Sequence, residues 1–266
     1  MKTAIIGTGN IGTAIAQGLL RGTLTEVEEV TCTVRSGESV ERLRGLLPEG
    51  VRVTRDNGEA VVGSKLIIVA VKPGLVKGVI QEIRPWLTEE HLLVSVAAGV
   101  TIEELSGFMG EKGRVIPLYR LMPNTALSVS QSVTLLSVGG QSGLRRASLE
   151  GGEHLCRLFS ELGGVYVIPE SLMESGTLLT SAGIAFALRY IRAATEGGVA
   201  LGFTPALAQE LVMGTVFGAV SLLKAKGGHP EVEIDKVTSA GGVTIRGLNA
   251  MEAGGFTAAV QAGLRL

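Results

Sequence analysis

Residues 3–20 read TAIIGTGNIGTAIAQGLL, and this stretch decides the fold of the chain. The apolar run 3–6 is typical of a buried parallel strand. It leads directly into Gly7-Thr-Gly-Asn-Ile-Gly12, and residues 13–20 follow with helical periodicity. Strand, G-x-G-x-x-G and helix therefore stand in the order that a dinucleotide-binding unit requires.

Each glycine of this loop has a separate task in such a unit. Gly7 makes the tight turn, Gly9 lets the backbone approach the pyrophosphate, and Gly12 lets the helix pack on the strand. The alternative is a plain turn, because the chain contains 38 glycines. The flanking strand and helix favour the cofactor loop, which we expect to comprise Gly7, Thr8, Gly9, Asn10, Ile11 and Gly12.

The residues after the second predicted strand, 29–34, indicate which dinucleotide binds. A site that prefers NAD has Asp or Glu here, to bind the ribose 2′-hydroxyl. This chain has Arg35-Ser36-Gly37 instead. A guanidinium and a hydroxyl suit a 2′-phosphate, so we predict NADPH as the preferred cofactor and NADH as an alternative. The competing interpretation of Arg35 is a solvated loop arginine.

Further apolar runs predict strands over 66–71, 92–96, 115–121, 132–138 and 165–168. Ligands of such sheets bind beyond the carboxyl ends of the strands. Candidates to line the cofactor are therefore Lys72, Pro73, Ala97, Ala98, Pro123 and Asn124. Lys72 is equally compatible with an ordinary surface lysine. Asn57, before a predicted helix, is either a cofactor residue or a helix cap.

The C-terminal third contains no convincing strand after Pro169, and helices are predicted over 171–179, 183–201, 205–226, 230–237, 243–251 and 257–266. Their apolar residues lie on more than one face, so they need more partners than one small bundle offers. We expect a homodimer built through them; the alternative is a buried helical core in a monomer. The predicted class is α/β, with a Rossmann-type doubly wound sheet over 1–168 and an all-α dimerisation and substrate-binding domain over 169–266.

Composition favours a cytoplasmic enzyme. The net charge of −1 gives no electrostatic case for nucleic acid or a membrane surface. We expect no membrane span, because no apolar run approaches the roughly 20 residues needed, and no signal peptide, because a strand begins at residue 3. The two cysteines are expected to be small core residues, and the three histidines are scattered without metal-ligand spacing.

Residues 235–252 read DKVTSAGGVTIRGLNAME, with a Gly pair between two helical patterns. Such a pair lets backbone N–H groups approach a ligand, and a helix N-terminus favours an anion there. Thr244 is then placed to offer a hydroxyl beside a bound carboxylate. The alternative is a helix-turn-helix corner whose glycines relieve a steric problem.

These motifs together resemble the pyrroline-5-carboxylate reductase family over essentially the whole chain. The resemblance rests on Gly7 to Gly12, Ala70-Val71-Lys-Pro73, Ser95 to Gly99, Arg120 to Thr125 and above all TSAGGVTI over 238–245. It implies reduction of the cyclic imine Δ1-pyrroline-5-carboxylate to L-proline with NAD(P)H. It also implies interleaved C-terminal helices in a dimer, and dimers that often assemble into decamers.

The resemblance further implies residue roles. The threonine at Thr244 would donate a hydrogen bond to the imine nitrogen. The loop of Ser239, Gly241, Gly242 and Val243 would receive the substrate carboxylate. Glu170 and Ser181 fall in segments that face the substrate in the family.

Several departures lie near the substrate segments. Residues 181–186 read SAGIAF where the family usually has Gly-Ser-Gly-Pro-Ala-Tyr/Phe, and Ala240 stands where proline is usual. They leave open a different cyclic imine, such as a six-membered piperideine carboxylate. Two rival functions remain: an F420-dependent NADP reductase, whose N-terminal motif is similar, and a non-catalytic NADP-binding paralogue acting as a sensor or scaffold.

Overall fold

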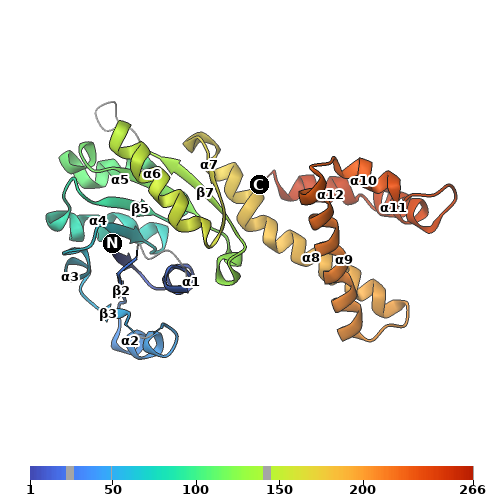
Figure 1. Cartoon of the computed structure of the whole chain (residues 1–266), viewed down its shortest axis with the longest axis horizontal. Coiled ribbons are helices and arrows are strands. Elements are labelled where there is room, and N and C mark those ends of the chain that lie inside the picture. Colours follow the sequence, from blue (N-terminus) through green and yellow to red (C-terminus); the bar gives the residue numbers. More distant parts are fainter. Residues whose placement is uncertain (22–26, 49, 140–144, 266) are drawn as a thin grey trace. The chain divides into compact units, whose positions relative to one another are not determined.

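The computed structural model describes residues 1–21, 27–48, 50–139 and 145–265, drawn in Figure 1. They divide into two compact units, Met1–Ser181 and Ala182–Leu266. Residues 169–181 thus pack with the sheet-containing unit. The predicted domain boundary, after residue 168, lies 13 residues before the division between these two units. It stays a prediction.

The first unit is built on one eight-stranded sheet in the order β3-β2-β1-β4-β5-β6-β7-β8. Neighbouring strands are parallel, except that β7 runs antiparallel to β6. The order of the first six strands is that of a doubly wound dinucleotide-binding sheet, which confirms the predicted fold class. The strands are β1 (Lys2–Ile6), β2 (Glu29–Thr33), β3 (Arg52–Thr54), β4 (Leu66–Val69), β5 (Leu92–Ser95), β6 (Leu118–Met122), β7 (Ser132–Val138) and β8 (Gly163–Val167).

Helices cover both faces of this sheet (Figure 1). Side chains of α1 (Asn10–Arg21), α2 (Gly37–Arg44) and α6 (Arg145–Ser160) enter one apolar core. Those of α3 (Asn57–Val61), α4 (Val76–Ile83) and α5 (Ile102–Met109) enter the other. Four short 3-10 helices join these elements: η1 (Pro73–Leu75), η2 (Arg84–Trp86), η3 (Gly110–Arg114) and η4 (Thr125–Val129).

The sequence located seven of these strands and missed β3. With only three residues, none of them fully buried, β3 carries too little apolar pattern to stand out. The strand predicted from residue 115 begins at Leu118, because the N–H of Val115 bonds back to the carbonyl of Lys112 in a turn and Pro117 has no N–H. A capping box of Thr101 and Glu104 begins α5.

Both cysteines are free, as expected of small core residues. Cys32 on β2 is completely buried, and this burial raises the pKa of its thiol to about 12. Cys156 on α6 is partly buried and packs against the same core. Neither thiol is therefore poised for nucleophilic chemistry.

A connecting segment follows the sheet: η5 (Glu170–Leu172), α7 (Met173–Thr177) and the π-helix η6 (Leu178–Ala182). The second unit then consists of α8 (Gly183–Ala200), α9 (Pro205–Lys226), α10 (Pro230–Lys236), α11 (Val243–Ala253) and α12 (Phe256–Gly263). Thr204 caps α9, and Pro205 is its first residue. The rings of Tyr190 on α8 and Phe256 at the start of α12 meet edge to face, with centroids 6.5 Å apart.

The helices of the second unit leave their apolar side chains uncovered. Among the described residues of this unit, Ala208 is the one fully buried apolar side chain. Phe217 on α9 is 75% exposed, and Leu188 on α8 is 59% exposed. Surface of this kind marks an interaction site.

Two helical stretches, Glu170–Ala200 and Pro205–Lys226, are long and apolar enough by length and composition to cross a membrane. The expectation that no segment reaches this length is therefore wrong. Helices that pack against a partner chain pass the same test, because both environments select apolar side chains on more than one face.

Candidate functional site

The glycine loop after β1 has the geometry that its sequence predicted. Gly7 has φ of +91°, a conformation that side chains other than glycine rarely adopt. A Cβ on Gly12 would overlap the carbonyl oxygen of Gly7, so this glycine is required where α1 meets the turn. A Cβ on Gly9 would meet nothing within 4 Å. Gly9 therefore faces open space, and its backbone is accessible to a ligand.

The side chain of Thr8 holds the glycine loop in place. It is buried, and Oγ1 donates to the carbonyl of Thr33 at 2.6 Å. The N–H of Gly7 in turn donates to Thr33 Oγ1 at 3.1 Å. These bonds tie the glycine loop to the end of β2, so the two loops that should hold a dinucleotide are fixed together.

A cavity of about 750 Å³ opens at the carboxyl ends of the parallel strands, beside the glycine loop. Its walls come from the ends of the first four strands and from α4. Eight of the residues predicted to bind cofactor line it: Gly7, Thr8, Gly9, Arg35, Asn57, Ala70, Val71 and Lys72. The structure thus brings together, from four separate loops, residues chosen from sequence alone.

Arg35 is exposed at the mouth of this cavity, and no ion pair engages its guanidinium within the described part of the chain. Arg55 also lines the cavity and was missed by the sequence analysis. It follows β3, and without that strand there was no signal to place it at a carboxyl end. The N–H of Val34 bonds the carbonyl of Thr54, which holds the two arginine-bearing loops side by side. Two guanidiniums here suit a phosphate ligand.

Asn57 does not cap α3, because the cap is Asp56, whose carboxylate accepts from the N–H of Glu59. Asn57 instead lines the cavity and donates from Nδ2 to Glu82 at 3.0 Å. The cofactor interpretation of Asn57 is the one that its position favours.

The remaining predicted cofactor residues lie outside the lining of this cavity: Asn10, Ile11, Gly12, Ser36, Pro73, Ala97, Ala98, Pro123 and Asn124. Three have evident structural tasks. Ser36 caps α2 by accepting from the N–H of Ser39, and Gly12 provides the close packing described above. Asn124 is buried, with both ends of its amide engaged in hydrogen bonds. Their roles toward a cofactor stay predictions.

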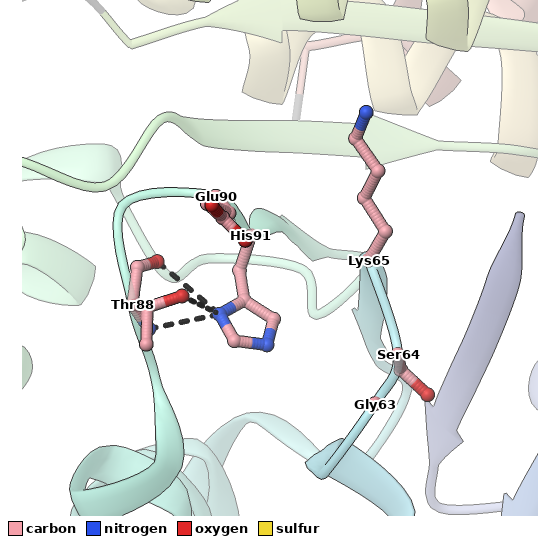
Figure 2. A pocket seen from close by; sticks show the side chains of 6 residues that line it. All are labelled: Gly63, Ser64, Lys65, Thr88, Glu90 and His91. Atoms are coloured by element: carbon pink, nitrogen blue, oxygen red, sulfur yellow. Dashed lines mark hydrogen bonds between the residues drawn. The ribbon is translucent and has the colours of Figure 1, made fainter.

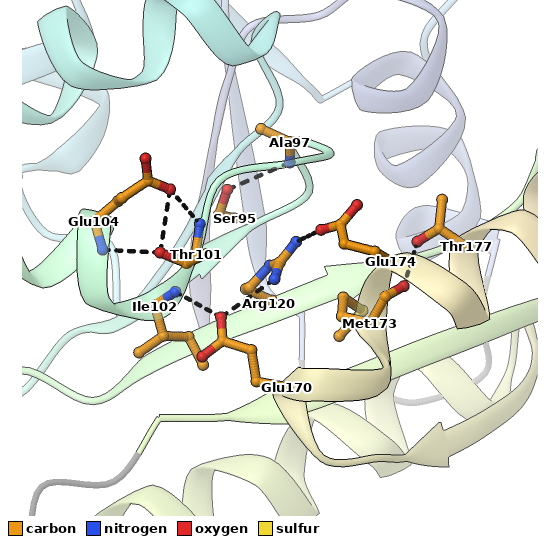
Figure 3. Close-up of polar contacts among 10 residues, drawn as sticks. All are labelled: Ser95, Ala97, Thr101, Ile102, Glu104, Arg120, Glu170, Met173, Glu174 and Thr177. Atoms are coloured by element: carbon orange, nitrogen blue, oxygen red, sulfur yellow. Dashed lines mark hydrogen bonds and ion pairs between the residues drawn. The ribbon is translucent and has the colours of Figure 1, made fainter. Parts of the chain in front are cut away.

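A buried arginine lies beyond the cavity, on β6 (Figure 3). Arg120 is 1% exposed, and its guanidinium pairs with Glu170 at 3.2 Å and Glu174 at 2.6 Å. Glu170 also accepts from the N–H of Ile102 at 2.7 Å. Glu170, a predicted substrate residue, is thus held by the protein itself at both Arg120 and the start of α5.

The predicted substrate loop lies in the second unit, between α10 and α11. Gly241 has φ of +68°, and the N–H of Gly242 bonds the carbonyl of Ser239 at 3.0 Å, which closes a tight turn. Thr244 lies in the first turn of α11, half-buried. Within the described residues, no hydrogen bond engages the hydroxyl of Ser239 or of Thr244. The loop therefore offers two free hydroxyls beside the first N–H groups of a helix, an arrangement suited to a carboxylate.

A second cavity, of about 610 Å³, lies at the opposite edge of the sheet (Figure 2). It is lined by Gly63, Ser64, Lys65, Thr88, Glu90 and His91, at the amino ends of β4 and β5. His91 Nδ1 accepts from the N–H of Thr88 at 2.8 Å, which fixes the ring. Because parallel sheets bind ligands at their carboxyl ends, we assign no function to this cavity. No group of three His, Cys, Asp or Glu suited to a metal occurs among the described residues.

Two family models match separate regions of the chain. Residues 170–265 match the family model described as pyrroline-5-carboxylate reductase dimerisation. Residues 2–99 match the model described as NADP oxidoreductase coenzyme F420-dependent.

Relatives match over the whole chain. Pyrroline-5-carboxylate reductase 1 of Dictyostelium discoideum is 37% identical over 98% of this chain, which spans 47% of that protein's length. Pyrroline-5-carboxylate reductase 2 of the same organism is 32% identical over 98% of this chain and 89% of that protein. The structure of 1-pyrroline-5-carboxylate reductase from Streptococcus pyogenes superposes with a TM-score of 0.85 at 29% identity, covering 99% of this chain and 95% of that one.

Arg35 generates a test of cofactor choice. We expect Arg35→Ala to weaken NADPH binding by about 10- to 100-fold, the value of a charge-assisted contact, and to leave NADH binding nearly unchanged. Dissociation constants from nucleotide fluorescence measure both. Arg44→Ala removes a similar charge from α2 outside the cavity and should alter neither. Equal weakening for the two nucleotides would remove Arg35 from phosphate recognition.

Proposed function

The chain belongs to the pyrroline-5-carboxylate reductase family, and on that premise we propose that it reduces Δ1-pyrroline-5-carboxylate to L-proline with NADPH. The observation that carries the proposal is the turn from Ser239 to Thr244. It places a positive-φ glycine, a helix start and an unengaged threonine hydroxyl together. The resemblance implies that these residues bind the substrate, and the local geometry is suited to that role.

The first unit fits a bound NADP. The open face of Gly9 leaves room for a pyrophosphate, and Arg35 with Arg55 supplies two cations for a 2′-phosphate. The absence of Asp or Glu at position 35 removes the group that would repel such a phosphate. NADH lacks the 2′-phosphate, so we propose that it binds more weakly than NADPH.

The residues of the second unit would bind and orient the substrate. The first N–H groups of α11, beginning at Val243, would face the substrate carboxylate, supported by the hydroxyl of Ser239. The hydroxyl of Thr244 would donate a hydrogen bond to the ring nitrogen of the neutral imine. Once that nitrogen is protonated, the same hydroxyl would accept from its N–H and so stabilise the charged form. When bound, NADPH supplies the hydride that adds to the imine carbon. Because a protonated imine is already electrophilic, the protein's main task is to hold the substrate in place.

The second unit would also form a homodimer. Its exposed apolar side chains coincide with the region that matches the dimerisation model. We extend the proposal to decamers assembled from such dimers, as the family resemblance implies. We also propose the cytoplasm as the location, because two free thiols suit a reducing compartment.

Two alternatives are motivated by the changes at Ala182, Ile184 and Ala240. Six-membered piperideine carboxylate is the second candidate substrate. A non-catalytic NADP-binding role is the second candidate function. The F420-dependent reductase is disfavoured, because that model covers residues 2–99 whereas residues 170–265 match the dimerisation model.

The function is tested by NADPH oxidation with the five-membered imine, the six-membered imine and no imine. We expect rapid turnover of Δ1-pyrroline-5-carboxylate. Turnover of the six-membered ring alone would reassign the substrate. NADPH binding without turnover of either would favour the non-catalytic role.

Thr244 is tested by removing its hydroxyl. We expect Thr244→Ala to lower kcat by about 10- to 1000-fold, the range for losing a polarising or proton-relay group. Thr244→Ser retains the hydroxyl and should recover most of the activity. Thr257→Ala on α12 removes a hydroxyl that bonds Glu252 and serves as the matched control. Unchanged turnover in Thr244→Ala would take this residue out of the mechanism.

The dimer is tested by light scattering at micromolar concentration, where we expect about twice the chain mass of 27.6 kDa or a larger multiple. Phe217→Glu places a charge on the exposed face of α9 and should raise the dimer dissociation constant at least about tenfold. Leu149→Glu makes the same change on α6, outside the dimerisation region, and should not. A wild-type monomer at this concentration would refute the dimer.

A further inference from the structure

The segment from Glu170 to Ser181 is helical and joins β8 to the second unit. Side chains of β6 and the residues that follow it hold the segment against the sheet. Met173 contributes the apolar part of this attachment, because it is fully buried against Met122 and Leu135. The polar part consists of two separate anchors.

The first anchor is Arg120, at the amino-terminal part of the segment (Figure 3). A buried guanidinium is costly unless it is paired and hydrogen-bonded. Glu170 and Glu174 supply the pairing from successive turns of the segment, at 3.2 and 2.6 Å. Any displacement of η5 or α7 would leave this charge buried without partners, so the segment is held in one position.

The second anchor is Asn124, at the carboxyl-terminal part. This residue is 4% exposed. Its Nδ2 donates to the carbonyl of Thr180 at 3.1 Å, while Oδ1 accepts from the N–H of Ala126 at 3.1 Å. Its own N–H donates to Ser132 Oγ at 3.3 Å. One donor and one acceptor of the amide are thus engaged, and burial of the residue limits the access of a cofactor to the rest.

The bond from Asn124 reaches the one π-helix found in the described chain, Leu178–Ala182. A π turn is locally less favourable than an α turn and is found mostly at functional positions. Asn124 bonds a carbonyl within this turn and thereby favours its wide geometry. The next residue is Ser181, whose hydroxyl is buried without a hydrogen-bond partner. A buried, unsatisfied hydroxyl costs free energy and is available to a ligand or an ordered water.

We propose that Asn124 is a positioning residue for imine reduction: it holds the π turn so that the Ser181 hydroxyl is available to the substrate, while Arg120 anchors the preceding η5 and α7. This inference rests on the proposed function. It assigns Asn124 a role through Thr180 and Ser181, in place of the cofactor contact predicted from sequence. Because the reaction depends on orientation, a loosened π turn should impair turnover more than it impairs NADPH binding.

The experiment compares Asn124→Ala with Ser64→Ala in the full-length protein. Ser64 makes a buried hydrogen bond to the carbonyl of Ala60 at 2.8 Å, at the opposite edge of the sheet. Ser64→Ala therefore also removes one buried hydrogen bond, but it leaves the π turn unchanged. Asn124→Ser is a second variant, because a serine at this position keeps a short acceptor for Ala126 but does not reach Thr180. Three quantities are measured: amide hydrogen exchange over residues 176–182, the NADPH dissociation constant, and kcat with KM for the imine.

We expect both Asn124 variants to exchange faster over 176–182 than Ser64→Ala, with NADPH affinity within about threefold of wild type. We expect kcat/KM for the imine to fall by about 10- to 100-fold, the cost of a displacement near 1 Å. Unchanged exchange over 176–182 would overturn the proposal, and so would a loss of NADPH affinity as large as the loss of kcat/KM.

The wild-type assay separates this proposal from the proposed function. If wild type reduces neither imine, the proposed function fails. Hydrogen exchange over residues 176–182 then still tests whether Asn124 holds the π turn. Faster exchange in both Asn124 variants supports this role, and unchanged exchange overturns it.

Discussion

The close approach of α1 to the turn after β1 is the constraint from which the first unit follows. At Gly12 the helix comes so near the carbonyl of Gly7 that no side chain fits between them. β1 is a central strand, with β2 on one side and β4 on the other. Contact at this point therefore gathers the loops after several strands around one cavity, where Arg35, Arg55 and Lys72 all lie. The packing of Gly12 on Gly7 thus fixes the glycine loop, which is one wall of this cavity.

A second constraint is electrostatic and concerns β6. Arg120 is buried within β6, and its charge requires partners that the sheet does not supply. The two glutamates that supply them lie on the segment that follows the sheet. This requirement explains why residues 169–181 pack with the first unit although they are helical and resemble the second in composition. The same segment ends in the π turn that carries Ser181.

The second unit obeys a different constraint. Its helices are apolar on several faces, and within one chain they bury almost none of that surface. This exposed apolar surface favours association, because a partner that covers it removes it from water. The family relationship supplies the simplest partner, a second copy. Length and hydropathy alone do not distinguish such helices from membrane spans, which is why two of them pass that test. A dimer accounts for the same exposed surface without a bilayer.

The sequence by itself determined the fold class, the glycine loop, seven of the eight strands and the glycine turn before α11, which is proposed as the substrate loop. These features are local: strand and helix periodicity, turn glycines and caps act over a few neighbouring residues. Only the tertiary structure decided what distant residues do together. It placed Arg55 beside Arg35 through the unpredicted strand β3, and it engaged Glu170 with Arg120 and Asn124 with Thr180. Pairs separated by dozens of residues leave no periodic signal in the chain, because their proximity arises from strand order and burial, which only the folded protein establishes.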